Sequence, residues 1–243
     1  MSFITKNDGQ FAYFDTQLGH PIWKGKTVLD FGGNIGNILH HPESTINHDR
    51  YWCIDVSKDA IEAGRKAAPA AHFVFYDRYN TEYNPHGIKR LPPPRVGGEF
   101  DFILCLSVFT HTAKNEMIEM VSHLKSILGR KGRLAVTFLD PHYVPPGSSK
   151  CNLRYYLEQR LEDKSPALVN TFLDQAASAD WCALAGIDLE LEGSVFKELS
   201  AGQSQEYLAF YTTRYVKRIF CGAAVLSPVK PFERQHCCVI RNE

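Results

Sequence analysis

The chain has 243 residues, a hydrophobic content of 44% and 27 basic residues balanced by 27 acidic ones. This length allows one full domain or one domain with a sizeable insertion, and the apolar content is high enough for a substantial core. The balanced charge lacks the basic excess that is typical of nucleic-acid-binding proteins. No apolar run has the length of a membrane span, and seven cysteines without CxxC spacing argue against a disulfide framework. These features indicate a soluble protein in a reducing, cytoplasmic setting.

Five short β-forming segments alternate with helix-forming stretches in the first part of the chain. They are residues 27–31, 51–55, 72–77, 100–106 and 133–139. Most are near-continuous apolar runs, which is typical of parallel strands buried on both faces. Residues 57–68 and 114–128 show helical periodicity, with Ser57 as an N-cap and Gly129 as a C-terminal cap. The alternation predicts an α/β protein with a doubly wound, mostly parallel, Rossmann-like sheet.

Two stretches depart from this alternation. Residues 78–98 are rich in proline, glycine and asparagine and predict a long loop after the third strand. Residues 141–204 follow the fifth strand, and we interpret them as a substrate lid inserted into a single domain that spans residues 1–243. This insertion and the residues just after it contain helix candidates at 153–164 and 167–186 and a hairpin candidate at 188–211. A helix at 212–220 and strands within 223–228 and 234–242 complete the predicted fold.

The first predicted strand runs into the glycine-rich turn DFGGNIG and then into an apolar helix start. Glycines at positions 32, 33 and 36 permit a sharp turn and a close approach of the backbone to a ligand. The dinucleotide-binding pattern GxGxxG does not fit, because Asn34 occupies the second glycine position. An acidic residue, Asp30, stands two positions before the first glycine.

Acidic residues also close the second and third predicted strands. Asp55 lies 23 residues beyond Gly32, near the roughly 20 expected for a carboxylate that accepts hydrogen bonds from ribose hydroxyls. Asp77 ends the third strand. One such acid alone is compatible with a helix cap. Because parallel strands bring their carboxyl ends to one edge of the sheet, the acids and the glycine turn together predict a ligand site there.

The pattern Asp30-x-Gly32-x-Asn34-x-Gly36 resembles motif I of the class I S-adenosylmethionine (SAM)-dependent methyltransferases, with Asn34 in place of a common glycine. The succession YNPHG, FDFILCLSVFTH and GRLAVTF is similar to a small-molecule subgroup of that family, over roughly residues 25–140. The tail QHCCVIRN resembles the family's antiparallel seventh strand. The resemblance implies a seven-stranded sheet, SAM as cofactor and S-adenosyl-L-homocysteine as product.

The resemblance also implies a role for each part of the cofactor site. The glycine turn would pass along the methionine portion of SAM, the acid of the second strand would hold the ribose, and the end of the third strand would frame the adenine. The end of the fourth strand would border the transferring methyl group. The implied cofactor contacts are Asp30, Gly32, Gly33, Asn34, Gly36, Asp55, Val56, Asp77, Arg78, Leu106 and Ser107.

Two histidines are the candidate catalytic bases. His111, in SVFTHT just past the fourth strand, could take the proton from a hydroxyl or amine as it is methylated. The alternative is that His111 only holds its own loop while Thr112 caps the next helix. His142, in DPHYVPP after the fifth strand, is the second candidate, with a surface-loop position as its alternative. No spacing of histidine, cysteine and acidic residues predicts a metal site.

The sequence therefore predicts a methyltransferase that moves a methyl group from SAM to a small-molecule acceptor, most favourably to oxygen, with nitrogen or carbon less favoured. No nucleic-acid or membrane partner is expected, and the sequence carries no signal for an oligomeric state. One alternative is an NAD-dependent oxidoreductase, which Asn34 and the lack of a recognisable catalytic set disfavour. The other is a non-catalytic scaffold that binds SAM.

Overall fold

Seven strands form one sheet in the computed structural model, which describes residues 9–80, 83–112, 114–140, 143–144 and 211–242. The strand order is β3-β2-β1-β4-β5-β7-β6, with β1 to β5 parallel and β7 antiparallel to its neighbours β5 and β6. The strands are β1 Val28–Phe31, β2 Tyr51–Asp55, β3 His72–Phe75, β4 Phe100–Cys105, β5 Leu128–Phe138, β6 Ala224–Leu226 and β7 His236–Arg241. The predicted sheet with its antiparallel last strand is confirmed.

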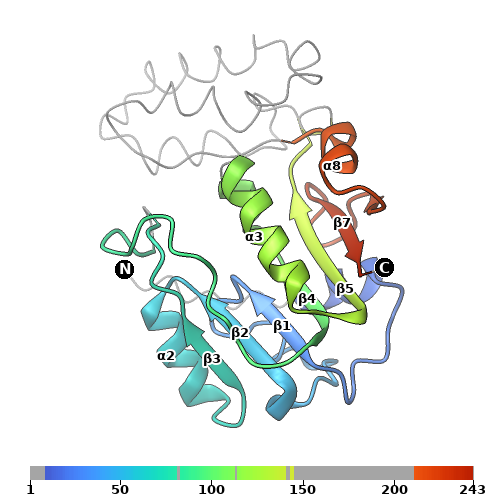
Figure 1. Ribbon diagram of the computed structural model, residues 1–243. Helices are drawn as coiled ribbons and strands as arrows, with labels where there is room; N and C mark the ends of the chain where they lie inside the picture. The colour runs from blue at the N-terminus through green and yellow to red at the C-terminus, as the bar shows by residue number, and fades with distance from the viewer. Residues whose placement is uncertain (1–8, 81–82, 113, 141–142, 145–210, 243) are drawn as a thin grey trace, which may run out of the picture.

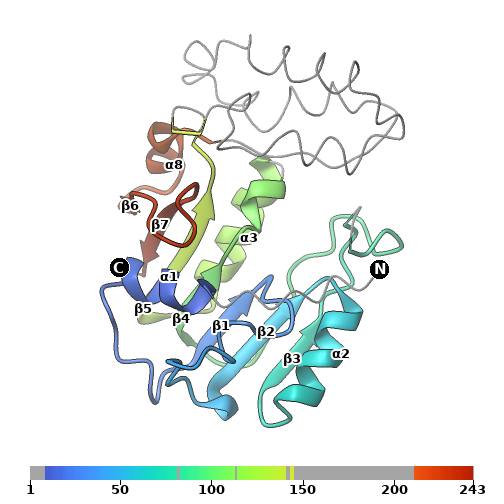
Figure 2. The ribbon, with the colours of Figure 1, turned by 180° about the vertical axis from the view of Figure 1, so that it is seen from behind.

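Helices cover both faces of this sheet (Figures 1 and 2). The helices α3 (Lys114–Ser126) and α8 (Thr213–Ile219) lie on one face, and α1 (Gly9–Gln17) and α2 (Lys58–Ala67) lie on the other. Each face has its own buried cluster, and the adjacent Cys237 and Cys238 of β7 belong to different clusters. This follows from the alternation of side chains along a strand. The doubly wound arrangement is therefore confirmed.

One local prediction about a helix end agrees with the structure. The side chain of Ser57 accepts a hydrogen bond from the backbone N–H of Ala60, as expected of an N-cap on α2. Thr212 caps α8 in the same way, by accepting from the N–H of Tyr215.

Two other local predictions are wrong. No helix follows the glycine turn, because residues 34–40 form consecutive turns and Gly36 has a φ of 84°, outside the helical region. Gly129 does not cap α3. The helix ends at Ser126, and β5 begins at Leu128 because the carbonyl of Ile127 already accepts from the N–H of Phe100 at 3.0 Å.

The predicted insertion leaves and rejoins the fold at one point, beyond the carboxyl end of β5. The carbonyl of Leu139 accepts from the N–H of Tyr211 at 2.8 Å, and Asp140 Oδ2 accepts from the N–H and the hydroxyl of Thr213 at 2.8 and 2.7 Å. The helices, most of the hairpin and the lid that the sequence predicts between these points lie outside the described residues. No helix within the described ranges is long and apolar enough to cross a membrane.

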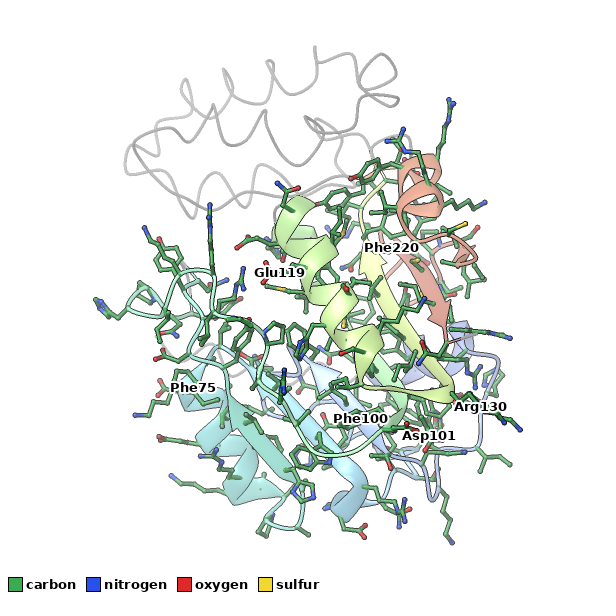
Figure 3. All side chains as sticks on the ribbon, in the orientation of Figure 1. Phe75, Phe100, Asp101, Glu119, Arg130 and Phe220 are labelled. Carbon is green, nitrogen blue, oxygen red and sulfur yellow. The ribbon has the colours of Figure 1, made fainter. Side chains whose placement is uncertain are left out.

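The strand order reverses between β1 and β4, which are neighbours at the centre of the sheet. In open α/β sheets, ligands bind outside the carboxyl ends of the strands at such a reversal. Figure 3 shows Phe100, Asp101 and Arg130 at the opposite, amino end of β4 and β5. The expected ligand position is therefore the edge formed by the ends of β1, β2 and β4.

Candidate functional site

The glycine turn after β1 runs through left-handed backbone conformations. Gly32, Asn34 and Gly36 have φ values of 78°, 55° and 84°, a region that glycine enters at little cost and asparagine tolerates. A Cβ atom on Gly32 would lie 2.5 Å from Cγ2 of Val108, which follows β4. The turn therefore packs directly against the segment after β4, and only glycine fits at position 32.

Asp55, at the end of β2, is hydrogen-bonded to this turn. Its Oδ2 accepts from the backbone N–H of Asn34 at 2.8 Å, and its Oδ1 accepts from the N–H of Ser57 at 2.7 Å. Burial raises the pKa of Asp55 above its ordinary value, and the backbone N–H groups partly counteract this rise. Each carboxylate oxygen carries two lone pairs, so Asp55 retains the capacity to accept from a ligand.

Asp30 lies beneath the glycine turn, with 1% of its surface exposed. Its Oδ2 accepts from the hydroxyl of Tyr51 at 2.6 Å, and a Cβ atom on Gly33 would lie 2.5 Å from its Cγ. Burial raises the pKa of Asp30 to about 7, the hydrogen bond from Tyr51 opposes the rise, and the charge of Asp55 adds to it. Asp30 therefore supports the turn from the inside of the sheet.

Asp77 follows β3 and organises the loop of residues 78–98, which has no helix or named strand among its described residues, as predicted. Its Oδ1 accepts from the side-chain amide of Asn84 at 3.0 Å, and its carbonyl accepts from the N–H of Ile88 at 2.8 Å. The loop thus folds back on the end of β3, where the adenine is expected.

The side chain of Arg78 is buried, with 4% of its surface exposed, and joins this loop to α3. Its guanidinium donates to the carbonyl of Leu91 at 2.6 Å and to the carboxylate of Glu116. Figure 3 labels Phe75 at the end of β3, shortly before this loop, and Glu119 on α3. The resemblance implied Arg78 as a cofactor contact, and the sequence gives no signal for this buried side-chain role.

Ser107 lies at the end of β4 in a left-handed conformation, with a φ of 57°. Its N–H donates to Thr137 Oγ1 at 2.8 Å, and the Gln235 side-chain amide donates to Ser107 Oγ at 2.7 Å. The hydroxyl of Thr137 donates to Gln235 Oε1 at 2.5 Å. Thr137 and Gln235 were not predicted as site residues, because Gln235 reaches Ser107 only through the antiparallel pairing of β7 with β5.

Of the two predicted bases, the structure describes only His111. His111 is exposed on a short 3-10 turn, η2 (Phe109–His111), and its N–H donates to the carbonyl of Val108 at 3.2 Å. The hydroxyl of Thr112 donates to the same carbonyl at 2.8 Å. His142 lies outside the described residues. Of the remaining predicted contacts, Leu106 is buried at the end of β4 and Val56 is half-buried after β2.

Comparison with known proteins agrees with this geometry. Residues 29–134 match the family model described as a methyltransferase domain. The matched stretch contains the glycine turn, the acids of the first three strands and Ser107. This match confirms the resemblance found in the sequence. None of the curated proteins matches the chain.

Solved structures share the fold at low sequence identity. The PH0226 protein from Pyrococcus horikoshii is 12% identical with a TM-score of 0.53, over 97% of this chain and 90% of that one. A SAM-dependent methyltransferase from Clostridium acetobutylicum is 8% identical with a TM-score of 0.51, over 98% and 92%. PKMT2 from Rickettsia typhi, in complex with AdoHcy, is 12% identical with a TM-score of 0.51, over 92% of this chain. The chain spans only 50% of the Rickettsia protein.

Proposed function

We propose that the protein transfers a methyl group from SAM to the oxygen of a small-molecule acceptor. The observation that carries this proposal is the hydrogen bond between the N–H of Asn34 and Asp55 Oδ2, at 2.8 Å. It places the backbone of the glycine turn beside the one acid that the family resemblance assigns to the ribose. The similar proteins from Clostridium and Rickettsia support the choice of cofactor, since the first is described as SAM-dependent and the second was solved with AdoHcy.

The cofactor is proposed to lie across the carboxyl ends of β1, β2 and β4. The turn from Gly32 to Gly36 would contact the methionine portion, and Asp55, with Val56 beside it, would accept from the ribose hydroxyls. Asp77 and the backbone of Arg78 would frame the adenine. Asp30 would act from beneath, by supporting the turn through its contact with Gly33.

Bound SAM supplies a methyl group on a positively charged sulfur, already activated for displacement. The chain then has to align the acceptor oxygen with that methyl group and keep water away. Such alignment accounts for much of the rate enhancement of enzymes that bring two reactants together. Leu106 and Ser107, at the end of β4, would border the transfer. The three-residue network of Ser107, Thr137 and Gln235 holds this border in place.

His111 is the proposed base that takes the proton of the acceptor hydroxyl, and His142 is the second candidate. His111 is exposed beyond the end of β4, two residues past the buried Phe109 that anchors its turn. We further propose that residues 141–204 form a lid in the single domain and govern the acceptor rather than the cofactor. The position of the insertion supports this, because the hydrogen bonds between Asp140 and Thr213 hold its two flanks together beyond the carboxyl end of β5.

Methyl transfer from radiolabelled SAM to a panel of phenols, alcohols and amines tests the proposal. We expect label to appear in hydroxylated acceptors. Transfer to amines alone would replace oxygen with nitrogen as the acceptor atom. A protein that binds S-adenosylhomocysteine and yet transfers to no acceptor is the result expected of a non-catalytic scaffold.

A further inference from the structure

Three aromatic rings meet where β5 ends and β7 begins. Because β7 is antiparallel, its first residue, His236, pairs with Phe138, the last residue of β5. The two rings stack with centroids 5.5 Å apart and planes 26° apart. Tyr143 meets the His236 ring edge-on, at 5.2 Å and 85°, and 42% of its own surface is exposed. We call these three residues the ring wall.

The ring wall lies beside the segment that is proposed to border the methyl group. Gln235, directly before His236, donates to Ser107 Oγ at 2.7 Å. Ser107 in turn donates from its N–H to Thr137, the neighbour of Phe138. The wall and the end of β4 therefore share the carboxyl edge of the sheet, on the side away from β2 and β3. This is the side left for an acceptor once a cofactor spans β1, β2 and β4.

One nitrogen of the His236 imidazole lacks a hydrogen-bond partner in the part of the chain that the structure describes. Its Nδ1 is buried and has no hydrogen-bond partner among the described residues. Orphaned N–H groups are rarer in protein interiors than under-satisfied acceptors. The tautomer that fits the site therefore keeps its proton on Nε2 and leaves only a lone pair at Nδ1.

The ring is neutral near pH 7. Burial lowers the pKa of His236 below its ordinary value of 6.5, and the negative charge of Asp140 counteracts this only in part. Asp140 itself accepts from the N–H and hydroxyl of Thr213 through Oδ2. The wall thus offers the exposed ring of Tyr143 and a neutral N–H donor on the half-buried His236, with the buried Phe138 behind it.

We propose that the ring wall binds an uncharged aromatic hydroxy compound as the methyl acceptor, with Nε2–H of His236 donating to an oxygen of that compound. This inference rests on the proposed function and adds the acceptor class to it. Planar rings favour aromatic partners through stacked and edge-on contacts. His236 binds and orients the acceptor but does not take its proton, because the one nitrogen with a lone pair is buried. The proton goes to the base, for which His111 is proposed.

Phenol and toluene are the probes that test this assignment, since they differ only in the hydroxyl group. Their binding is measured by NMR on the His236 ring resonances, with the protein alone and with saturating S-adenosylhomocysteine. Phenol is expected to shift these resonances and to bind about three- to tenfold more tightly than toluene, the contribution of one hydrogen bond. Equal binding of the two probes, or no shift with phenol, overturns the assignment.

Three variants separate the donor from the ring. His236→Phe keeps the stack and removes the donor, so phenol should bind about three- to tenfold more weakly while toluene is unaffected. In the His236 variants, which lack the His236 ring, binding is followed instead on the NMR signals of phenol and toluene. His236→Gln restores an amide N–H near the position of Nε2 and should recover most of the preference for phenol. His72→Phe is the matched control, because His72 stacks on Trp52 at 4.1 Å at the amino end of β3.

The two proposals fail in different ways. If His236→Phe binds phenol as the parent protein does, the acceptor class is wrong even when S-adenosylhomocysteine binds. If S-adenosylhomocysteine does not bind while the preference for phenol depends on His236, the cofactor assignment is wrong. The binding of an aromatic hydroxy compound at the ring wall is then still supported.

Discussion

Asp55 Oδ2 accepts the backbone N–H of Asn34 at 2.8 Å, so the acid that closes β2 also fixes the turn that follows β1. The second oxygen of Asp55 accepts from Ser57, the residue that caps α2. One carboxylate thus ties together a turn, a strand end and a helix start. A change at Asp55 should therefore alter both the ribose contact and the shape of the turn.

Replacing Asp55 with alanine removes the charged acceptor that the ribose hydroxyls need. Hydrogen bonds to charged groups contribute roughly 1.5–3 kcal/mol, so the affinity for S-adenosylhomocysteine should fall by about 10- to 100-fold. Calorimetry measures this directly. Asp59→Ala, on the exposed first turn of α2, is the control and should bind as the parent does. Equal affinity of the Asp55 and Asp59 variants would remove Asp55 from the site.

Gly32 and Gly25 form a matched pair for testing the glycine turn. Both have left-handed backbones, with φ of 78° and 77°, but a Cβ atom meets Val108 at position 32 and nothing within 4 Å at position 25. Gly25→Ala should lower the free energy of unfolding by about 1–2 kcal/mol, because alanine is strained in a left-handed backbone. Gly32→Ala should lower the free energy of unfolding by about 1–3 kcal/mol more, because the added methyl group overpacks the turn. It should also weaken binding of S-adenosylhomocysteine. Thermal or urea unfolding gives the first comparison and calorimetry the second. Similar losses in the two variants would show that the turn is not tightly packed against the segment after β4.

Asp30 should make the protein less stable as the pH rises. Its pKa is about 7 in the folded protein against an ordinary 3.8, so between these values the unfolded chain releases a proton that the folded protein keeps. The free energy of unfolding should therefore fall from about pH 4 to about pH 7, by up to about 4 kcal/mol from this group, and level off above. Asp30→Asn keeps an oxygen for the hydroxyl of Tyr51 and should flatten this slope in urea unfolding at several pH values. Asp59→Asn should leave the slope unchanged, and a slope that persists in Asp30→Asn would contradict the assignment.

His111→Ala tests the proposed base. Turnover with a hydroxylated acceptor should fall by about 10²–10⁴-fold, the usual contribution of a positioned proton acceptor. The affinity for S-adenosylhomocysteine should stay the same, and the acidic limb of the pH–rate profile should disappear, because a protonated imidazole cannot act as a base. If His111 only holds its loop, the variant should instead lose thermal stability and keep the limb. Turnover within a few-fold of the parent protein excludes the base role.

The sequence predicts most of the sheet because its central strands are buried on both faces and read as apolar runs. All four residues of β1 are buried, as are five of the six in β4. The Gly32–Gly36 turn could be identified because a short-range glycine pattern marks it. Asp55 could be identified because it ends the second apolar strand, 23 residues beyond Gly32. Short-range patterns also misled at residues 34–40, where Gly36 prevents the expected helix.

The contacts that the sequence did not predict depend on residues far apart in the chain. Gln235 meets Ser107 across 128 positions, and His236 meets Phe138 only through the antiparallel pairing of β7 with β5. Arg78 reads as an ordinary loop cation, yet its guanidinium is buried against α3. No local pattern encodes such contacts, since they follow from the order of strands in the finished sheet.

Calorimetric titration of the protein with S-adenosylhomocysteine and, separately, with NAD tests the central claim most directly. That claim places an adenosyl cofactor of the methyltransferase type over the glycine turn and Asp55. The account predicts one S-adenosylhomocysteine bound per chain, with the affinity lowered in Asp55→Ala, and no binding of NAD. Binding of NAD with no heat from S-adenosylhomocysteine would contradict the account and favour an oxidoreductase.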